Sequence, residues 1–303
     1  MTTTPAIVSD DLPVLYRGAS QQSGDAQRSF LRWFELRLYA VVLAAFGGAI
    51  AWQVGHMYIG GVIAFLAFAV ALGAELVLAI RRPDEIWYEA RAAAESAKSL
   101  SWRYMMRGES FETSVENPEA TLLAELRDLL SDLDALPVRA KSGSDVQITP
   151  TMRQVRALPF EERRTVYLQE RIQTQQGWYA DEAARNQTRA NRWVTASIAL
   201  EFLGLVGAAV KAAGWTEIDL LGILATAAAG ATGWMQAKQY RTLATDYGYT
   251  SQELATVASE VEAVQDEAVW ARLITQAEGT ISHEQSLWRA SRGYRVKQRG
   301  REM

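Results

Sequence analysis

The sequence has no cysteine among its 303 residues, which excludes disulfides, thiolate metal sites and cysteine nucleophiles. It has only two histidines, His56 and His283, and neither has a second histidine at metal-ligand spacing. No Walker motif, nucleophile elbow or GxGxxG sequence is present. We therefore expect no catalytic residue, no cofactor site and no metal site, and a protein that is not an enzyme.

A strong excess of either charge is also missing. The formal net charge is −4, so nothing in the charge balance suggests a nucleic-acid partner. The 7 prolines and 21 glycines are too few for a disordered chain. The mean hydropathy of −0.09 is low for a protein that lies mostly in a membrane. It fits a small bilayer portion beside long cytosolic helices.

What the sequence does contain is long apolar runs, and two of them form a pair. Residues 193–210 and 218–235 are apolar apart from one acid each, Glu201 and Asp219. An 18-residue helix is about 27 Å long, close to the hydrocarbon thickness of a bilayer. The short turn between the runs allows only an antiparallel hairpin. The pattern predicts a membrane hairpin; the alternative is a buried helical pair in a soluble bundle.

A second pair of apolar runs lies nearer the N-terminus. Residues 57–80 form the longest run, with Glu75 as its only charge. The run 38–54 is short, so it is either a span or a buried segment. Together the runs predict an all-α membrane protein with two transmembrane helical hairpins, that is four spans. Long cytosolic helices would form a bundle or coiled coil.

The charges that flank the hairpins predict their orientation. Arginine and lysine gather outside both ends of each hairpin, so the positive-inside rule places the N- and C-termini in the cytoplasm. Arg32-Trp33 and Arg192-Trp193 open the two hairpins about 160 residues apart, which indicates a parallel duplication. The predicted organisation is a disordered tail 1–25, a first two-transmembrane domain 26–136, a linker 137–150 and a second such domain 151–303.

Small and polar residues recur every three or four positions along the runs. Small residues at this spacing let membrane helices pack closely, and polar ones hydrogen-bond across the contact. The predicted helix-packing residues are Gly60, Ala64, Ala71, Gly204, Gly222 and Gly230, and the candidate polar residues are Glu75, Glu201, Ser197 and Thr226. An acid on such a stripe should face protein or water. The polar residues either line a pore or only form bonds between helices.

Helical sequence continues beyond the membrane runs. After the second run, Ile86, Ala90, Ala93, Ala97, Leu100 and Tyr104 alternate by four and three residues, and the segment from Leu243 to Ala268 does the same. A 3.5-residue period predicts helices that continue from the membrane as coiled-coil stalks. The alternative is one face of an antiparallel bundle within a single chain. Further helices are predicted at 118–136 and from Thr149-Pro150, with a break at Pro159.

Several of these segments resemble the SLATT family, the two-transmembrane effectors associated with bacterial nucleotide-linked conflict systems. In the second half the similar segments are Ile148–Ile172, Gln176–Asn186, Arg189–Trp193, Gly233–Ala255 and Ala277–Arg292. In the first half, WYEARAAAESAKSLSWRYMMRGESF (Trp87–Phe111) resembles a sister subfamily. These segments extend over nearly the whole chain after residue 25, and their residues are structural rather than catalytic.

The resemblance implies a tandem SLATT protein in the bacterial inner membrane. Such proteins are thought to act in antiphage defence as pore-forming effectors, once a nucleotide-second-messenger sensor or synthase system detects infection. The implied partners are the lipid bilayer, further copies in a homo-oligomer and that trigger system. Two other hypotheses stay open: a membrane-anchored helical scaffold without pore activity, and a soluble all-α bundle.

Overall fold

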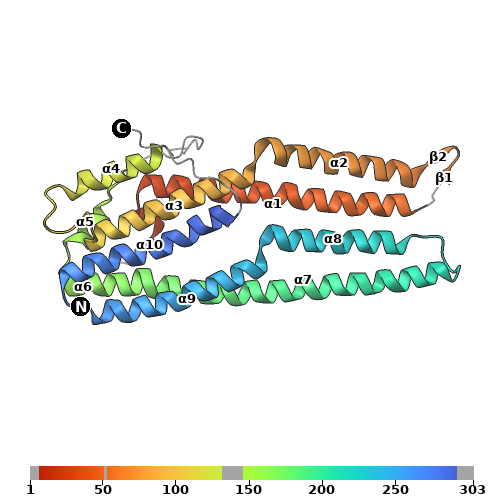
Figure 1. The fold of residues 1–303 in the computed structure, drawn as a ribbon. Helices are drawn as coiled ribbons and strands as arrows, with labels where there is room; N and C mark the ends of the chain where they lie inside the picture. Colours follow the sequence, from red (N-terminus) through yellow and green to blue (C-terminus); the bar gives the residue numbers. More distant parts are fainter. Residues whose placement is uncertain (1–6, 51–52, 132–145, 292–303) are drawn as a thin grey trace, which may run out of the picture. The chain divides into compact units, whose positions relative to one another are not determined.

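The computed structural model describes residues 7–50, 53–131 and 146–291, and these are mainly α-helical (Figure 1). The elements are η1 (Ser9–Asp11), α1 (Val14–Ala49), β1 (Gln53–Val54), β2 (Met57–Tyr58), α2 (Ile59–Arg81), α3 (Pro83–Met106), α4 (Pro118–Ser131), α5 (Pro150–Ala157), α6 (Phe160–Val166), the π-helical η2 (Tyr167–Gln173), α7 (Thr174–Ala212), α8 (Leu220–Lys238), α9 (Tyr240–Ala263) and α10 (Glu267–Ser291). The all-α prediction is confirmed, with one small exception: β1 and β2 form a two-residue antiparallel ladder in the turn around His56.

The chain divides into two compact units that do not follow its two halves. The membrane unit comprises Gln27–Pro83 and Tyr179–Tyr249. The bundle unit comprises the described residues of Met1–Ala26, Asp84–Trp178 and Thr250–Met303. Each unit therefore contains helices from both halves of the sequence, and α1, α7 and α9 contribute residues to both.

Three helices among the described residues are long and apolar enough to cross a membrane. They are α2 (Ile59–Arg81) and two longer helical stretches: Phe160–Ala212, which contains α6, η2 and α7, and Leu220–Ala263, which contains α8 and α9. The apolar part of α1 is shorter, because α1 ends at Ala49 and the last two residues of the predicted run 38–54 belong to β1. Residues 51–52 lie outside the described part. A membrane protein is thus supported, and the fourth span stays a prediction.

The predicted stalks are wrong in one respect. The second helix of each hairpin ends inside the membrane unit and does not itself continue into the bundle unit. Arg82 has φ 42° and Gln239 has φ 51°, so each takes the left-handed conformation that terminates a helix. New helices, α3 and α9, begin at the following residue. Ala93 of α3, one of the residues in the 3.5-residue pattern, packs against Ala19 of α1 in the same chain. This packing favours a bundle within the chain over a coiled coil.

The N-terminal segment corrects the prediction of a disordered tail 1–25. Helix α1 begins at Val14, and its residues Leu15 and Ala19 are buried in the bundle unit together with Leu12. The segment 1–25 is polar overall, and a few apolar residues in helical register are enough to anchor it. Residues 1–6 lie outside the described part.

Prolines mark the starts of three helices. Pro83, Pro118 and Pro150 each occupy the first position of a helix, where a missing N–H is harmless. The Thr149 hydroxyl accepts from Met152 N at 3.2 Å, and the predicted break at Pro159 separates α5 from α6; both predictions are confirmed. The predicted helix 118–136 is seen as far as Ser131, and most of the predicted linker 137–150 lies outside the described residues.

Candidate functional site

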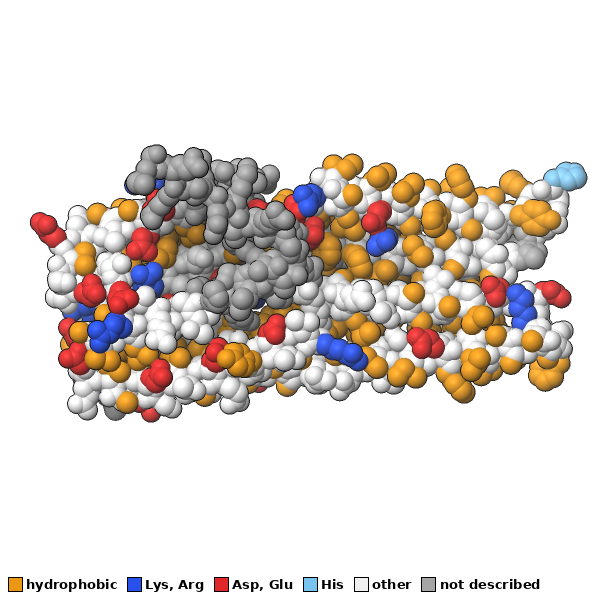
Figure 2. Space-filling view, viewed as in Figure 1, with side chains coloured by type: hydrophobic (Ala, Val, Ile, Leu, Met, Phe, Trp, Pro, Cys, Tyr) orange, Lys and Arg blue, Asp and Glu red, His pale blue; other side chains and the backbone are white. Residues whose placement is uncertain are grey.

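The membrane unit has its large apolar side chains on the outside. Phe65 on α2 is 72% exposed, and Phe202 and Leu205 on α7 are 64% and 66% exposed. Figure 2 shows hydrophobic side chains over much of the visible surface of α2, α7 and α8. The residues that are buried inside this unit are mostly alanine and glycine. A water-soluble protein buries its large apolar groups, so this inverted pattern indicates a lipid-facing surface.

Glycine allows close contact within each hairpin. A Cβ on Gly47 of α1 would lie 2.8 Å from Ala64 N, and one on Gly60 of α2 would collide with the carbonyl oxygens of Gly47 and Ile50. In the second hairpin, a Cβ on Gly207 would lie 2.7 Å from Leu220 Cβ. Neither helix pair could keep its spacing with a larger residue at these positions.

The predicted helix-packing residues occupy different environments. On α2, Gly60 and Ala71 are buried and Ala64 is half-buried. Gly204 is buried, and a Cβ there would be 3.5 Å from Leu221 Cδ1 of α8.

The two remaining glycines lie on α8. A Cβ on Gly230 would lie 3.9 Å from Val42 of α1, so α8 also packs on the first hairpin. Gly222 differs, because a Cβ there would meet the Asp219 carboxylate of its own turn instead of another helix.

Glu75 is partly exposed and has a partner across the hairpin. Its carboxylate forms an ion pair with Arg37 of α1, and the side chains of both residues are between a third and a half exposed. The buried position of the α2 stripe at this level is Ala74. This ion pair joins α1 and α2, and the assignment of Glu75 to a pore or only to bonds between helices stays a prediction.

Glu201 differs from the expectation for an acid on a packing stripe. Ser197 and Gly204 of α7 are buried, whereas Glu201 between them is exposed on the outer surface of the membrane unit. No hydrogen bond or ion pair from residues 7–50, 53–131 or 146–291 reaches its carboxylate. A spacing of four residues advances 400° around a helix, so Glu201 is rotated 40° from Ser197 and lies at the edge of the buried face.

The hydroxyl groups of the two remaining candidates lie inside the membrane unit. Thr226 Oγ1 donates to Gly222 O at 2.7 Å within α8, which satisfies the hydroxyl in its own helix. Ser197 Oγ is buried and has no hydrogen-bond partner among the described residues. The structure thus does not bring the four polar candidates together at one site.

The bundle unit contains a buried ion pair that sequence reasoning missed. Arg171 of η2 donates from Nε and Nη2 to the Glu278 carboxylate of α10 at 2.9 and 2.7 Å, and both side chains are at most 1% exposed. Tyr167 Oη, one turn earlier, donates to Glu278 Oε1 at 3.0 Å. The Arg171 guanidinium also lies over the Trp102 ring of α3. A π-helical turn is uncommon and often marks a constrained or functional position.

Lys98 of α3 lies beside this cluster. Burial lowers its pKa below the ordinary value, and the positive charge of Arg171 acts in the same direction, while Glu95 and Glu278 oppose it. The sequence contains one signal of this cluster. Trp270, Ile274, Ala277 and Ile281 form a buried stripe on α10, and Glu278 is a charge placed within it.

Comparison with known families gives two matches in tandem. The family model described as SMODS and SLOG-associating 2TM effector domain 3 matches residues 13–164, about half of the chain. The model described as SMODS and SLOG-associating 2TM effector domain 1 matches residues 167–288. No curated protein and no solved structure matches the chain.

Proposed function

This chain belongs to the SLATT family, the SMODS and SLOG-associating two-transmembrane effectors, and from this we propose that it forms an oligomeric pore. It is a membrane effector with two such domains in tandem. Pore formation would permeabilise the bacterial inner membrane on activation. The observation that supports the proposal is the outward position of Glu201.

Glu201 lies at a depth where contact between a carboxylate and lipid is unfavourable. It is the ninth of the 18 residues in the run 193–210, so it lies near the middle of the span. A carboxylate at that depth costs about 2.5–3.5 kcal/mol on insertion scales. Its neighbours on the same face, Ile198 and Leu205, are 60% and 66% exposed. Another copy of the chain or a water-filled path would remove this cost, and an oligomeric pore supplies both.

The activating signal would come from the conflict system that the family description names. SMODS and SLOG modules would act as the synthase or sensor of a nucleotide messenger, and the bundle unit would receive their signal. The arginines and lysines outside the hairpins favour cytoplasmic termini and four passes. In this arrangement the bundle unit lies in the cytoplasm, where such partners are found.

Electrical recording tests the pore. Detergent-purified protein is reconstituted in a planar bilayer, alone and with the associated system, beside the variants Glu201→Gln and Glu262→Gln. Glu262 is exposed on α9 in the bundle unit and serves as the matched control. We expect discrete conductance steps whose size or cation selectivity changes in Glu201→Gln and not in Glu262→Gln. Bilayers that stay silent with the complete system would contradict the proposal.

A membrane-anchored scaffold is the second candidate. The bundle unit favours it, because this unit packs helices from both halves of the sequence together and holds the buried Arg171–Glu278 pair. If the spans are only anchors, replacing 193–210 and 218–235 by unrelated apolar helices will preserve activity in cells. If the pore is the function, the same exchange will abolish it.

A further inference from the structure

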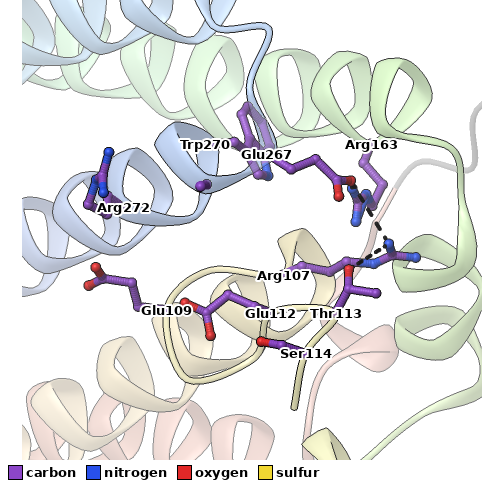
Figure 3. A pocket seen from close by; sticks show the side chains of 10 residues that line it. Arg107, Glu109, Glu112, Thr113, Ser114, Arg163, Glu267, Trp270 and Arg272 are labelled. Carbon is purple, nitrogen blue, oxygen red and sulfur yellow. Dashed lines mark hydrogen bonds and ion pairs between the residues drawn. The ribbon is translucent and has the colours of Figure 1, made fainter. Parts of the chain in front are cut away.

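The bundle unit contains a cavity whose lining is rich in charge. Its volume is about 390 Å³, within the range of small-molecule sites. The lining comes from the loop after α3 (Arg107 to Ser114), from α6 (Arg163) and from the start of α10 (Glu267 to Arg272). Figure 3 shows the Glu267 side chain extending toward Arg163 and Arg107.

Arg163 is the unusual residue of this cavity. Its side chain is 0% exposed, and Nη2 donates to Glu267 Oε1 at 2.6 Å. Its Nε and Nη1 are buried and have no hydrogen-bond partner among the described residues. A buried guanidinium normally uses most of its five donors, and each unpaired donor is unfavourable. The bond to Glu267 therefore uses only part of the hydrogen-bonding capacity of the Arg163 guanidinium.

Arg107 places a second guanidinium close to the same carboxylate. Its Nη1 lies 4.0 Å from Glu267 Oε1, while its Nε and Nη2 donate to Arg156 O. These bonds fix the position of Arg107. The Glu267 side chain, by contrast, is 52% exposed and can turn toward solvent. Glu267 is thus a replaceable anion between two arginines.

Two acids in the rest of the lining would suit polar groups that are not anionic, and Arg272 adds a third guanidinium. Glu109 and Glu112 can accept hydrogen bonds from hydroxyl or amino groups, and the Thr113 and Ser114 hydroxyls stand at the exposed rim. Trp270 forms a rigid wall, because it is 1% exposed and its Nε1 donates to Met106 O at 2.7 Å. The cavity is larger than a bare oxyanion needs.

We propose that this cavity binds a phosphorylated small molecule with several hydroxyl groups, such as a sugar phosphate or nucleoside phosphate. The phosphate displaces the Glu267 carboxylate and bonds to Arg163 and Arg107. A phosphate has more acceptor oxygens than a carboxylate, so it can pair with the free donors of Arg163. The hydroxyl groups bond to Glu109 and Glu112. The proposal concerns binding alone and holds whether or not the chain forms a pore.

Calorimetric titration of the full chain in detergent tests the site. The probes are AMP, ribose 5-phosphate, inorganic phosphate and adenosine. We expect AMP or ribose 5-phosphate to bind more tightly than inorganic phosphate, and adenosine not to bind. The relative affinities of AMP and ribose 5-phosphate show whether the site prefers a nucleoside phosphate or a sugar phosphate. The absence of binding by all three phosphorylated probes would overturn the proposal.

Three variants make the test specific. Arg163→Gln should weaken binding about ten- to hundredfold, the usual effect of losing hydrogen bonds to a charged group. Glu267→Gln should tighten binding, because it removes the competing anion while its amide oxygen can still accept a hydrogen bond from the buried Arg163. Arg153→Gln is the control, since Arg153 is bonded to Glu119 and does not line the cavity. Unchanged binding in Arg163→Gln, or weaker binding in Glu267→Gln, would refute the site.

Discussion

Individual residues of the bundle unit differ sharply in what they contribute to stability. Arg171 and Glu278 are both buried and are joined by two hydrogen bonds. Desolvation offsets much of the attraction in such a pair, so the intact pair adds little net stability. Removing one partner is different, because the other charge is then buried without compensation.

Substitution of Arg171 or Glu278 tests this argument. Arg171→Met should lower the free energy of unfolding by about 3–5 kcal/mol, since Glu278 loses its bidentate partner. The double variant Arg171→Met with Glu278→Leu should regain part of that loss. Denaturant unfolding followed by circular dichroism measures both, with Arg185→Met, at an exposed pair on α7, as the control. Equal destabilisation by the single and double variants would show that the pair is not coupled.

Glu201 and Glu278 show why sequence periodicity locates a stripe more reliably than single side chains. The stripe on α7 is present, but a 40° rotation separates buried Ser197 from exposed Glu201. Glu278 is buried because Arg171, 107 positions away in sequence, reaches it. Such a pairing depends on tertiary contacts, and no local pattern in one sequence contains it.

At the scale of elements, the two hairpins end in the same way. Arg82 after α2 and Gln239 after α8 both have left-handed backbone, and the next residue starts a new helix. The apolar runs and the parallel duplication could be predicted from hydrophobic periodicity and flanking charge. The two breaks could not, because neither residue is glycine and only Pro83 gives a local hint at the first of them.

The break at Gln239 should tolerate glycine. Left-handed backbone is unfavourable by about 1 kcal/mol or more for a residue with a side chain, and Gln239 Oε1 is also buried without a hydrogen-bond partner among the described residues. Gln239→Gly should therefore raise the free energy of unfolding by about 0.5–1 kcal/mol. Gln236→Gly, three positions earlier and inside α8, should lower it by about 1 kcal/mol. Thermal unfolding in detergent compares the two, and a loss of stability in both would argue against strain at this break.

At the scale of the whole molecule, the chain joins two units with opposite surface chemistry. The bundle unit buries aromatic residues such as Trp270 and Tyr167, whereas the membrane unit exposes Phe65 and Phe202. Composition predicted this division in outline, because a mean hydropathy near zero requires a polar part beside the apolar runs. It could not show that each unit draws helices from both halves, since that arrangement follows from long-range packing.

The absence of cysteine makes the oligomer directly testable by crosslinking. Leu205 lies one turn beyond Glu201 on the same face of α7, and Phe65 is an exposed residue of α2. If Glu201 is shielded by another copy, Leu205→Cys should form disulfide-linked dimers when membranes are oxidised, because paired Cα atoms must come within about 7 Å. Phe65→Cys should crosslink much less if that face contacts lipid. Non-reducing gels give the dimer fraction, and Leu205→Cys that stays monomeric would leave Glu201 facing lipid and remove the argument for a pore.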